Sequence, residues 1–143
     1  MQNMGGGKTA LGLDTGIGVL ICYFGNLACG LPLGIIYSIL VVVQDKTNKV
    51  ARFHAFQSLF LAALGVVFGI VVSIAVFITM MIDVAIAMAI GIPFIFTGIL
   101  GLIATVIGLG FLYFVVMAAI KGFNGEVYKI PVVGNFAEKY ANQ

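Results

Sequence analysis

Three long runs without a charged residue constrain this chain more than any other feature. They cover residues 17–43, 56–81 and about 94–120. The first two contain 27 and 26 residues, whereas about 20 apolar residues suffice to cross the hydrocarbon core of a bilayer. Only 8% of the 143 residues are charged, against roughly 25% in soluble domains. We therefore predict an all-α, polytopic integral membrane protein with a single membrane domain.

Three transmembrane helices are expected from these runs, with four as an alternative. The first run contains Gly-Leu-Pro-Leu-Gly at 30–34, and Pro32 removes a helical hydrogen bond. We predict one tilted, kinked span here, preceded by Asp14 as an N-cap. A re-entrant pair of half-helices that turns at 30–34 is the alternative for this run.

A single acidic residue lies between the second and third runs. Asp83 is the only charge between Arg52 and Lys121, and Gly-Ile-Pro follows at 91–93. We predict a short interfacial or re-entrant segment from Asp83 to Gly91, with Pro93 in the first turn of the third span.

The basic residues predict the orientation of the chain in its membrane. Six of the seven lie in two segments, the loop at 44–55 and the tail at 121–143. Cytoplasmic loops are enriched in Lys and Arg, so both segments are expected inside and the N-terminus outside. Within the tail, 134–140 is expected to form a short helix on the membrane, with Phe136 and Tyr140 on its inner face.

Small residues recur at helical spacing in the second and third runs. Gly65 and Gly69 form a GxxxG motif, and Gly101 and Gly108 belong to a second stripe. Such faces let helices approach closely in lipid. We predict that the two faces pack together within one chain, and dimerisation through them is the alternative.

Four segments carry a family resemblance. They are Gly12-Leu13-Asp14, Cys22-Tyr23, the Arg-Phe-His-Ala-Phe-Gln-Ser block at 52–58, and the tail at 125–139. Over about residues 12 to 139 the chain resembles the Tic-twenty-like family of small prokaryotic membrane proteins, also called domain-of-unknown-function family 4870. The resemblance implies three or four spans in the inner membrane and no established activity, although members are often described as protein-import components.

Few residues offer chemistry. His54 is the only candidate general base, and no Ser/His/Asp set or metal cluster accompanies it in its segment. Cys22 and Cys29 are about 10 Å apart along a helix, too far to bridge, and are expected to behave as small buried residues. We predict no enzymatic activity, no metal or cofactor, and, from the net charge of only +2, no nucleic-acid partner.

The polar stretch that opens the second run is the candidate site. Arg52, His54 and Gln57 need partners where water is scarce, and we predict a tie to the tail through an Arg52–Glu126 pair or an equivalent hydrogen-bond network. The alternative is that Arg52, with Lys46 and Lys49, binds anionic lipid headgroups or a partner.

Two functions from different classes follow. The first is a structural or accessory subunit of a larger membrane assembly, with other membrane subunits or further copies as partners. The second is a component of a protein- or solute-translocation channel that forms on oligomerisation, because the spans of one copy hold no charge with which to line a pore.

Overall fold

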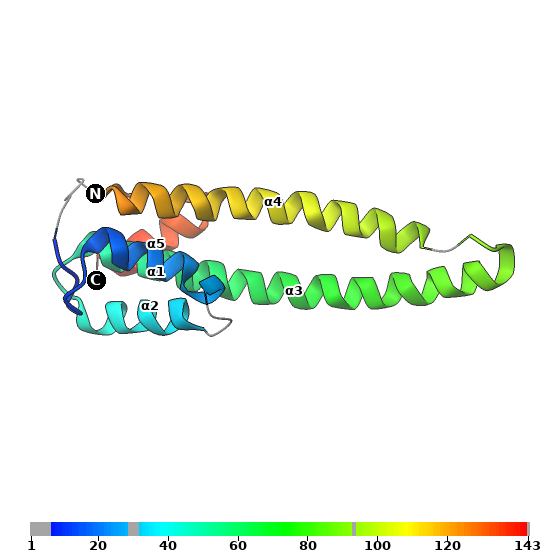
Figure 1. Ribbon diagram of the computed structural model, residues 1–143, viewed down its shortest axis with the longest axis horizontal. Helices are drawn as coiled ribbons and strands as arrows, with labels where there is room; N and C mark the ends of the chain where they lie inside the picture. The colour runs from blue at the N-terminus through cyan, green and yellow to red at the C-terminus, as the bar shows by residue number, and fades with distance from the viewer. Residues whose placement is uncertain (1–6, 29–31, 93, 143) are drawn as a thin grey trace. The chain divides into compact units, whose positions relative to one another are not determined.

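The structure, a computed structural model, describes residues 7–28, 32–92 and 94–142. Within them it has no strand, so the predicted all-α class is confirmed. The helices, shown in Figure 1, are α1 (Thr15–Ala28), α2 (Leu33–Gln44), α3 (Lys49–Ile90), α4 (Ile95–Phe123) and α5 (Val133–Ala141). Two compact units divide the chain: a core unit, up to Ala63 together with 114–143, and a hairpin unit, Leu64–Tyr113.

The first predicted span is two helices in the core unit. α1 has 14 residues and α2 has 12, which at 1.5 Å per residue makes them about 21 Å and 18 Å long. Each is shorter than the ~30 Å hydrocarbon core of a bilayer, and the two lie side by side and antiparallel (Figure 1), so the prediction of one tilted, kinked span is wrong. Pro32 precedes α2, whereas Cys29 and the first two residues of the 30–34 motif lie outside the described residues.

Small residues let α1 and α2 lie side by side. A Cβ atom on Gly25 would stand 2.8 Å from the backbone nitrogen of Gly34, so only glycine permits this approach. Cys22 is buried against Val41 of α2 and Ala51 and Ala55 of α3, as expected of a small apolar residue. Asp14 accepts a hydrogen bond from the Gly16 N–H at 2.9 Å, which confirms it as the N-cap of α1.

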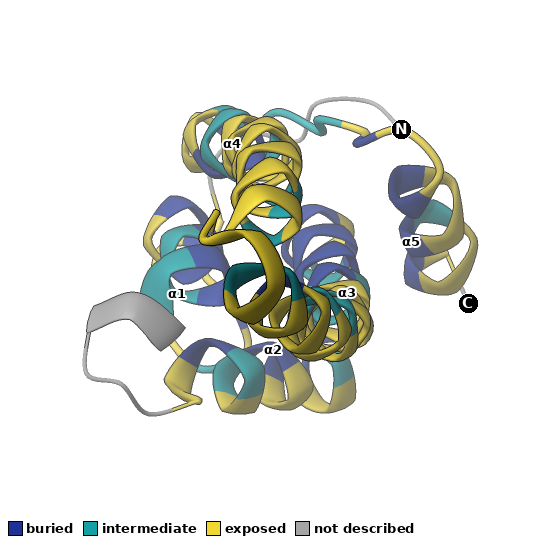
Figure 2. Ribbon diagram, turned by 90° about the vertical axis from the view of Figure 1, so that its right-hand side faces the viewer, coloured by how far each residue is buried: buried dark blue, intermediate teal, exposed yellow. Residues whose placement is uncertain are grey.

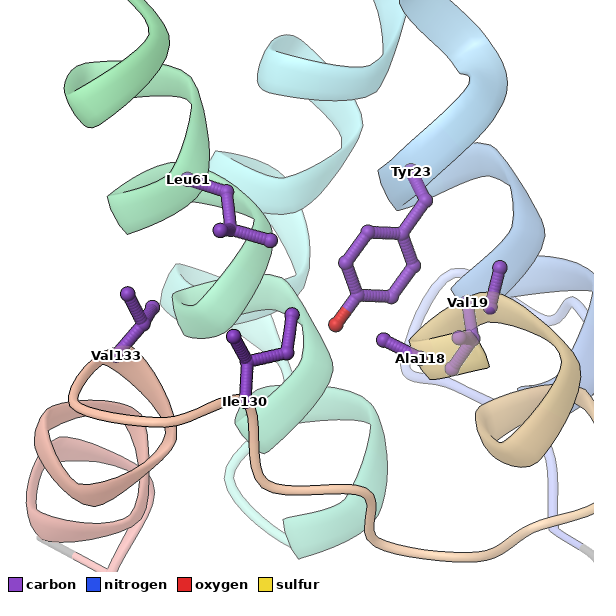
Figure 3. Packing of buried hydrophobic residues seen from close by; sticks show 7 residues of the cluster. Val19, Tyr23, Leu61, Ala118, Ile130 and Val133 are labelled. Atoms are coloured by element: carbon purple, nitrogen blue, oxygen red, sulfur yellow. The ribbon is translucent and has the colours of Figure 1, made fainter. Parts of the chain in front are cut away.

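The main apolar cluster of the core unit lies where α1, α3, α4 and the tail meet. Figure 3 shows Tyr23 of α1 projecting between Leu61 of α3 and Val19 and Ala118, with Ile130 of the tail near its hydroxyl. By contrast, the outer side of α2 is exposed, as Figure 2 shows, and its exposed residues include Leu33, Ile36, Ile39, Leu40 and Val43. Its buried residues are Gly34, Ser38 and Val41. That division suits a helix with protein on one side and lipid on the other.

In the hairpin unit, α3 runs past Asp83 without a break. The predicted separate segment from Asp83 to Gly91 is therefore wrong. Asp83 is 1% exposed, and its carboxylate accepts hydrogen bonds from the N–H groups of Phe96 at 3.0 Å and Thr97 at 2.8 Å. An acidic group satisfies the free N–H groups at a helix N-terminus, so this charge joins two helices rather than ending one. Pro93 lies outside the described residues.

Two helices in the described part of the chain are long and apolar enough to cross a membrane. They are α3, with 42 residues, and α4, with 29. They contain the predicted second and third spans. α1 and α2 are too short to meet this criterion. Of the three predicted spans, the second and third therefore remain candidate membrane spans, and the first is a pair of short helices.

Candidate functional site

A buried polar cluster joins α1, α3 and the segment that follows α4. Its centre is His54 and Gln57, which lie three residues apart on α3 and so on one face of the helix. Both are 0% exposed. Polar groups at this depth require hydrogen-bond partners, because leaving one unsatisfied costs roughly 1–3 kcal/mol.

Tyr23 of α1 links these two side chains. Its hydroxyl oxygen lies 3.1 Å from His54 Nδ1, and Gln57 Nε2 donates a hydrogen bond to the same oxygen at 2.9 Å. Since Gln57 is the donor to Tyr23, the Tyr23 hydroxyl is free to donate its proton toward His54 Nδ1. The hydroxyl therefore connects α1 to both residues of α3.

Backbone groups of the tail complete the cluster. His54 Nε2 lies 3.0 Å from the Glu126 carbonyl oxygen, Gln57 Nε2 donates to the Tyr128 carbonyl at 3.1 Å, and the Ile130 N–H donates to Gln57 Oε1 at 3.3 Å. A carbonyl only accepts, so the hydrogen-bond pattern assigns the proton of a neutral His54 to Nε2 and leaves Nδ1 as an acceptor. These bonds occupy both ring nitrogens and the whole Gln57 amide. The cluster thus ties α1, α3 and the tail together.

The end of α4 delivers the tail to this cluster. The Glu126 N–H donates to the Lys121 carbonyl at 2.9 Å and the Gly125 N–H to the Gly122 carbonyl at 3.0 Å, the pattern of a Schellman motif. Gly125 has a φ of 75°, a left-handed conformation that favours glycine. The reversed chain then presents the Glu126 carbonyl to His54.

The predicted Arg52–Glu126 pair is wrong. Glu126 Oε2 instead lies 2.8 Å from Lys121 Nζ, five residues before it in the chain. Arg52 is half-buried, and its guanidinium carbon lies 6.0 Å from the centre of the Phe56 ring. The hydrogen-bond network to the tail that was predicted in place of this pair is confirmed, and it is made by His54 and Gln57.

The loop between α2 and α3 is organised by its acidic residue. Asp45 is 1% exposed and accepts hydrogen bonds from the N–H groups of Ala10 at 3.0 Å and Asn48 at 2.9 Å. Asn48 in turn caps α3 by accepting from the Ala51 N–H at 3.0 Å. Lys46 of the loop and Lys49 at the start of α3 are exposed, so these cations face outward while the Asp45 carboxylate faces inward.

The predicted packing of the glycine faces is wrong. Added Cβ atoms at Gly65, Gly69, Gly101 and Gly108 would each meet no atom within 4 Å. The two helices of the hairpin unit contact each other at other positions instead. Thr97 Oγ1 of α4 donates to Thr79 Oγ1 of α3 at 3.3 Å, one turn from the Asp83 cap. The four glycines of the predicted faces are therefore open to their surroundings.

Helix α5 forms the expected short amphipathic element of the tail. Tyr140 lies 5.9 Å from both Phe56 and Phe60 of α3, measured between ring centres, and Phe136 lies 6.3 Å from Phe60. These contacts place both rings against α3, although Phe136 is 55% and Tyr140 41% exposed and the buried face of α5 is formed by Val133, Gly134, Ala137 and Ala141. That the helix lies on the membrane stays a prediction. Lys129 Nζ donates to Glu138 at 2.7 Å and holds the pKa of that carboxyl below its usual range.

Sequence reasoning missed Tyr23, the link of the cluster, although it lies in one of the segments of the family resemblance. It also missed Gly122, where a Cβ would stand 2.8 Å from His54 Nε2 and 2.5 Å from Val19 Cγ1. In the part of the chain that the structure describes, three or more His, Cys, Asp or Glu residues nowhere gather as metal ligands would.

Comparisons with known proteins yield one informative relative. The chain is 29% identical over 136 residues to a protein named UPF0132 membrane protein MJ1443 from Methanocaldococcus jannaschii, covering 94% of this chain and 96% of the relative. No protein-family model matches the chain, and no solved structure matches it. Together with its two long apolar helices, the relative indicates that this chain is a membrane protein.

Proposed function

We propose that this protein is a non-enzymatic accessory subunit of a larger membrane assembly in a prokaryotic inner membrane. The observation that carries the proposal is the hairpin unit. It exposes apolar side chains and six open glycines along two helices, and its one charged residue, Asp83, is buried against α4. Open glycines let a second helix approach closely in lipid, where association depends on backbone proximity.

The polar cluster supports a structural role for the rest of the chain. A general base needs access to a substrate, whereas His54 is fully buried and engaged at both ring nitrogens. In this proposal the core unit keeps α1, α2 and the tail folded together, and the hairpin unit binds the partner subunit. The resemblance to Tic-twenty-like proteins fits such a role and stays a prediction.

We expect Gly69→Leu to weaken assembly without weakening the fold. A Cβ atom at this position meets nothing within 4 Å, and leucine favours helix over glycine, so the free energy of unfolding should stay the same or rise by up to about 1 kcal/mol. In the assembly it would separate the backbones. The measurement is purification in mild detergent, with stoichiometry and thermal unfolding followed in parallel.

Val67→Leu is the matched control, because Val67 is an exposed apolar position two residues away. Membrane partners that co-purify at fixed stoichiometry with wild type and Val67→Leu, and are lost with Gly69→Leu, support the accessory role. A homo-oligomer that conducts ions in planar bilayers would favour the translocation component instead. Equal partner recovery with Gly69→Leu would contradict a role for this face.

The proposed topology puts the basic loop and the tail in the cytoplasm, with α1 and α2 as a re-entrant pair. The start of α1 then lies on the same side as the loop, to which the Ala10 N–H is bonded through Asp45, and not outside as three spans required. We expect Lys46→Cys and Lys139→Cys, in a chain without Cys22 and Cys29, to react with an impermeant maleimide only after cells are opened. Ile92→Cys, exposed in the turn of the hairpin unit, should react in intact cells. Labelling of either lysine position from outside would overturn this orientation.

A further inference from the structure

Arg52 is a cation that pairs with no carboxylate among the described residues. All five side-chain carboxylates lie in the described part of the chain, and each has other partners. Those partners are Gly16 for Asp14, Ala10 and Asn48 for Asp45, Phe96 and Thr97 for Asp83, Lys121 for Glu126, and Lys129 for Glu138. Arg52 Nε is buried without a hydrogen-bond partner among these residues. Within the described part of the chain, the guanidinium therefore has no neutralising charge, and its Nε has no acceptor.

The surroundings of Arg52 resemble the boundary between lipid and water. One helical turn further along α3 begins an aromatic patch, made of Phe56, Phe60, Phe136 and Tyr140. Phe136 is 55% exposed and Tyr140 is 41% exposed, so the patch is open on the side of α5. Aromatic residues gather at the level of lipid headgroups, and a phosphate is the anion that lies there.

A second cation belongs to the same face of the helix. Lys49 lies three residues before Arg52, which puts the two side chains on neighbouring positions of α3, and it is exposed. Arginine and lysine together offer several donors to an anion with several oxygens, and arginine binds phosphate through paired N–H groups.

From this geometry we propose that Arg52, assisted by Lys49, binds the phosphate of an anionic phospholipid whose acyl chains lie along the aromatic patch. A phospholipid matches both parts of this surface. Its phosphate oxygens carry negative charge for the cations, and its acyl chains are apolar and can contact the exposed rings. An acidic side chain of a protein partner would meet only the first. The proposal rests on the membrane location of the chain and is independent of the accessory role.

The test uses the full chain purified in a neutral detergent and titrated with single lipids while thermal unfolding is followed. Wild type should be stabilised by dioleoylphosphatidylglycerol at about tenfold lower concentration than by dioleoylphosphatidylcholine. Arg52→Gln should abolish this preference and Arg52→Lys should keep part of it. Lys139→Gln, which removes one exposed charge from α5, is the control and should behave as wild type. Inorganic phosphate alone should have no effect at the same concentrations.

Several results would overturn the proposal. An unchanged preference in Arg52→Gln would remove Arg52 from the site, and an equal loss in Lys139→Gln would show only a diffuse charge effect. Stabilisation by inorganic phosphate would point to a small-anion site. Wild type without any lipid preference would leave an acidic protein partner as the ligand of Arg52. If Arg52→Gln does not fold, native mass spectrometry compares how much phosphatidylglycerol wild type and Arg52→Lys retain. Equal amounts in the two proteins would contradict a phosphate held by the paired N–H groups of Arg52.

Discussion

Gln57→Leu should lower the free energy of unfolding by about 3 kcal/mol or more. Leucine fills similar space but leaves the Tyr128 carbonyl and the Ile130 N–H without the partner that they have in the wild type. Each buried group stranded in this way costs roughly 1–3 kcal/mol. The Tyr23 hydroxyl also loses a donor. Thermal or denaturant unfolding in detergent measures the total effect.

A local measurement distinguishes this mechanism from general loss of packing. Amide hydrogen exchange should rise first at Ile130, whose N–H is held by Gln57 Oε1, and then along 126–130. Ser73→Ala is the control, because its hydroxyl bonds within α3 at an exposed position. Unaltered exchange at Ile130 in a destabilised Gln57→Leu protein would show that the tail is held by other contacts.

The apolar helices and the need for a polar tie could be predicted because both follow from simple requirements. Charge-free runs longer than a bilayer is thick give long helices, and α3 and α4 contain the two runs predicted at 56–81 and 94–120. Polar residues beside such runs must find partners, so His54 and Gln57 were recognisable as a site before the partners were known. Which groups would satisfy them depends on tertiary structure, and Tyr23 was missed for that reason.

The errors share a physical origin. A run without charges has the same hydropathy whether it is one helix or two, so 17–43 did not reveal the antiparallel arrangement of α1 and α2. Asp83 suggested a break because a charge in an apolar helix is costly, but the N–H groups at the start of α4 satisfy its carboxylate. Arg52 and Glu126 suggested a pair, yet Lys121 lies within 2.8 Å of Glu126. Opposite charge predicts that a partner exists but does not predict which one.

The glycine pattern illustrates the same limit. Gly65, Gly69, Gly101 and Gly108 have the spacing of a packing face, and the structure leaves all four open. The glycines that do permit close approach are Gly25, between α1 and α2, and Gly122, against His54. Neither belongs to the predicted stripes. Spacing shows which side chains share a face but not which face meets a neighbour.

Gly122→Ala should destabilise the core unit by about 1–3 kcal/mol, the usual cost of forcing an extra carbon into a packed interior. The added Cβ would stand 2.5 Å from Val19 Cγ1 and 2.8 Å from His54 Nε2, closer than such atoms pack. His54 cannot retreat easily, because Tyr23 and the Glu126 carbonyl hold its two nitrogens. We expect the Nε2 hydrogen bond to lengthen and the turn at Gly125 to loosen.

Gly108→Ala provides the matched control for this substitution. It makes the same change in the same helix at a position where the added Cβ meets nothing within 4 Å, and alanine favours helix by up to about 1 kcal/mol. Gly108→Ala should therefore raise the melting temperature in detergent slightly, and Gly122→Ala should lower it. The His54 ring resonances should shift in Gly122→Ala alone, since only that substitution touches the imidazole. Two variants of equal stability would mean that α4 does not approach His54 as closely as this packing requires.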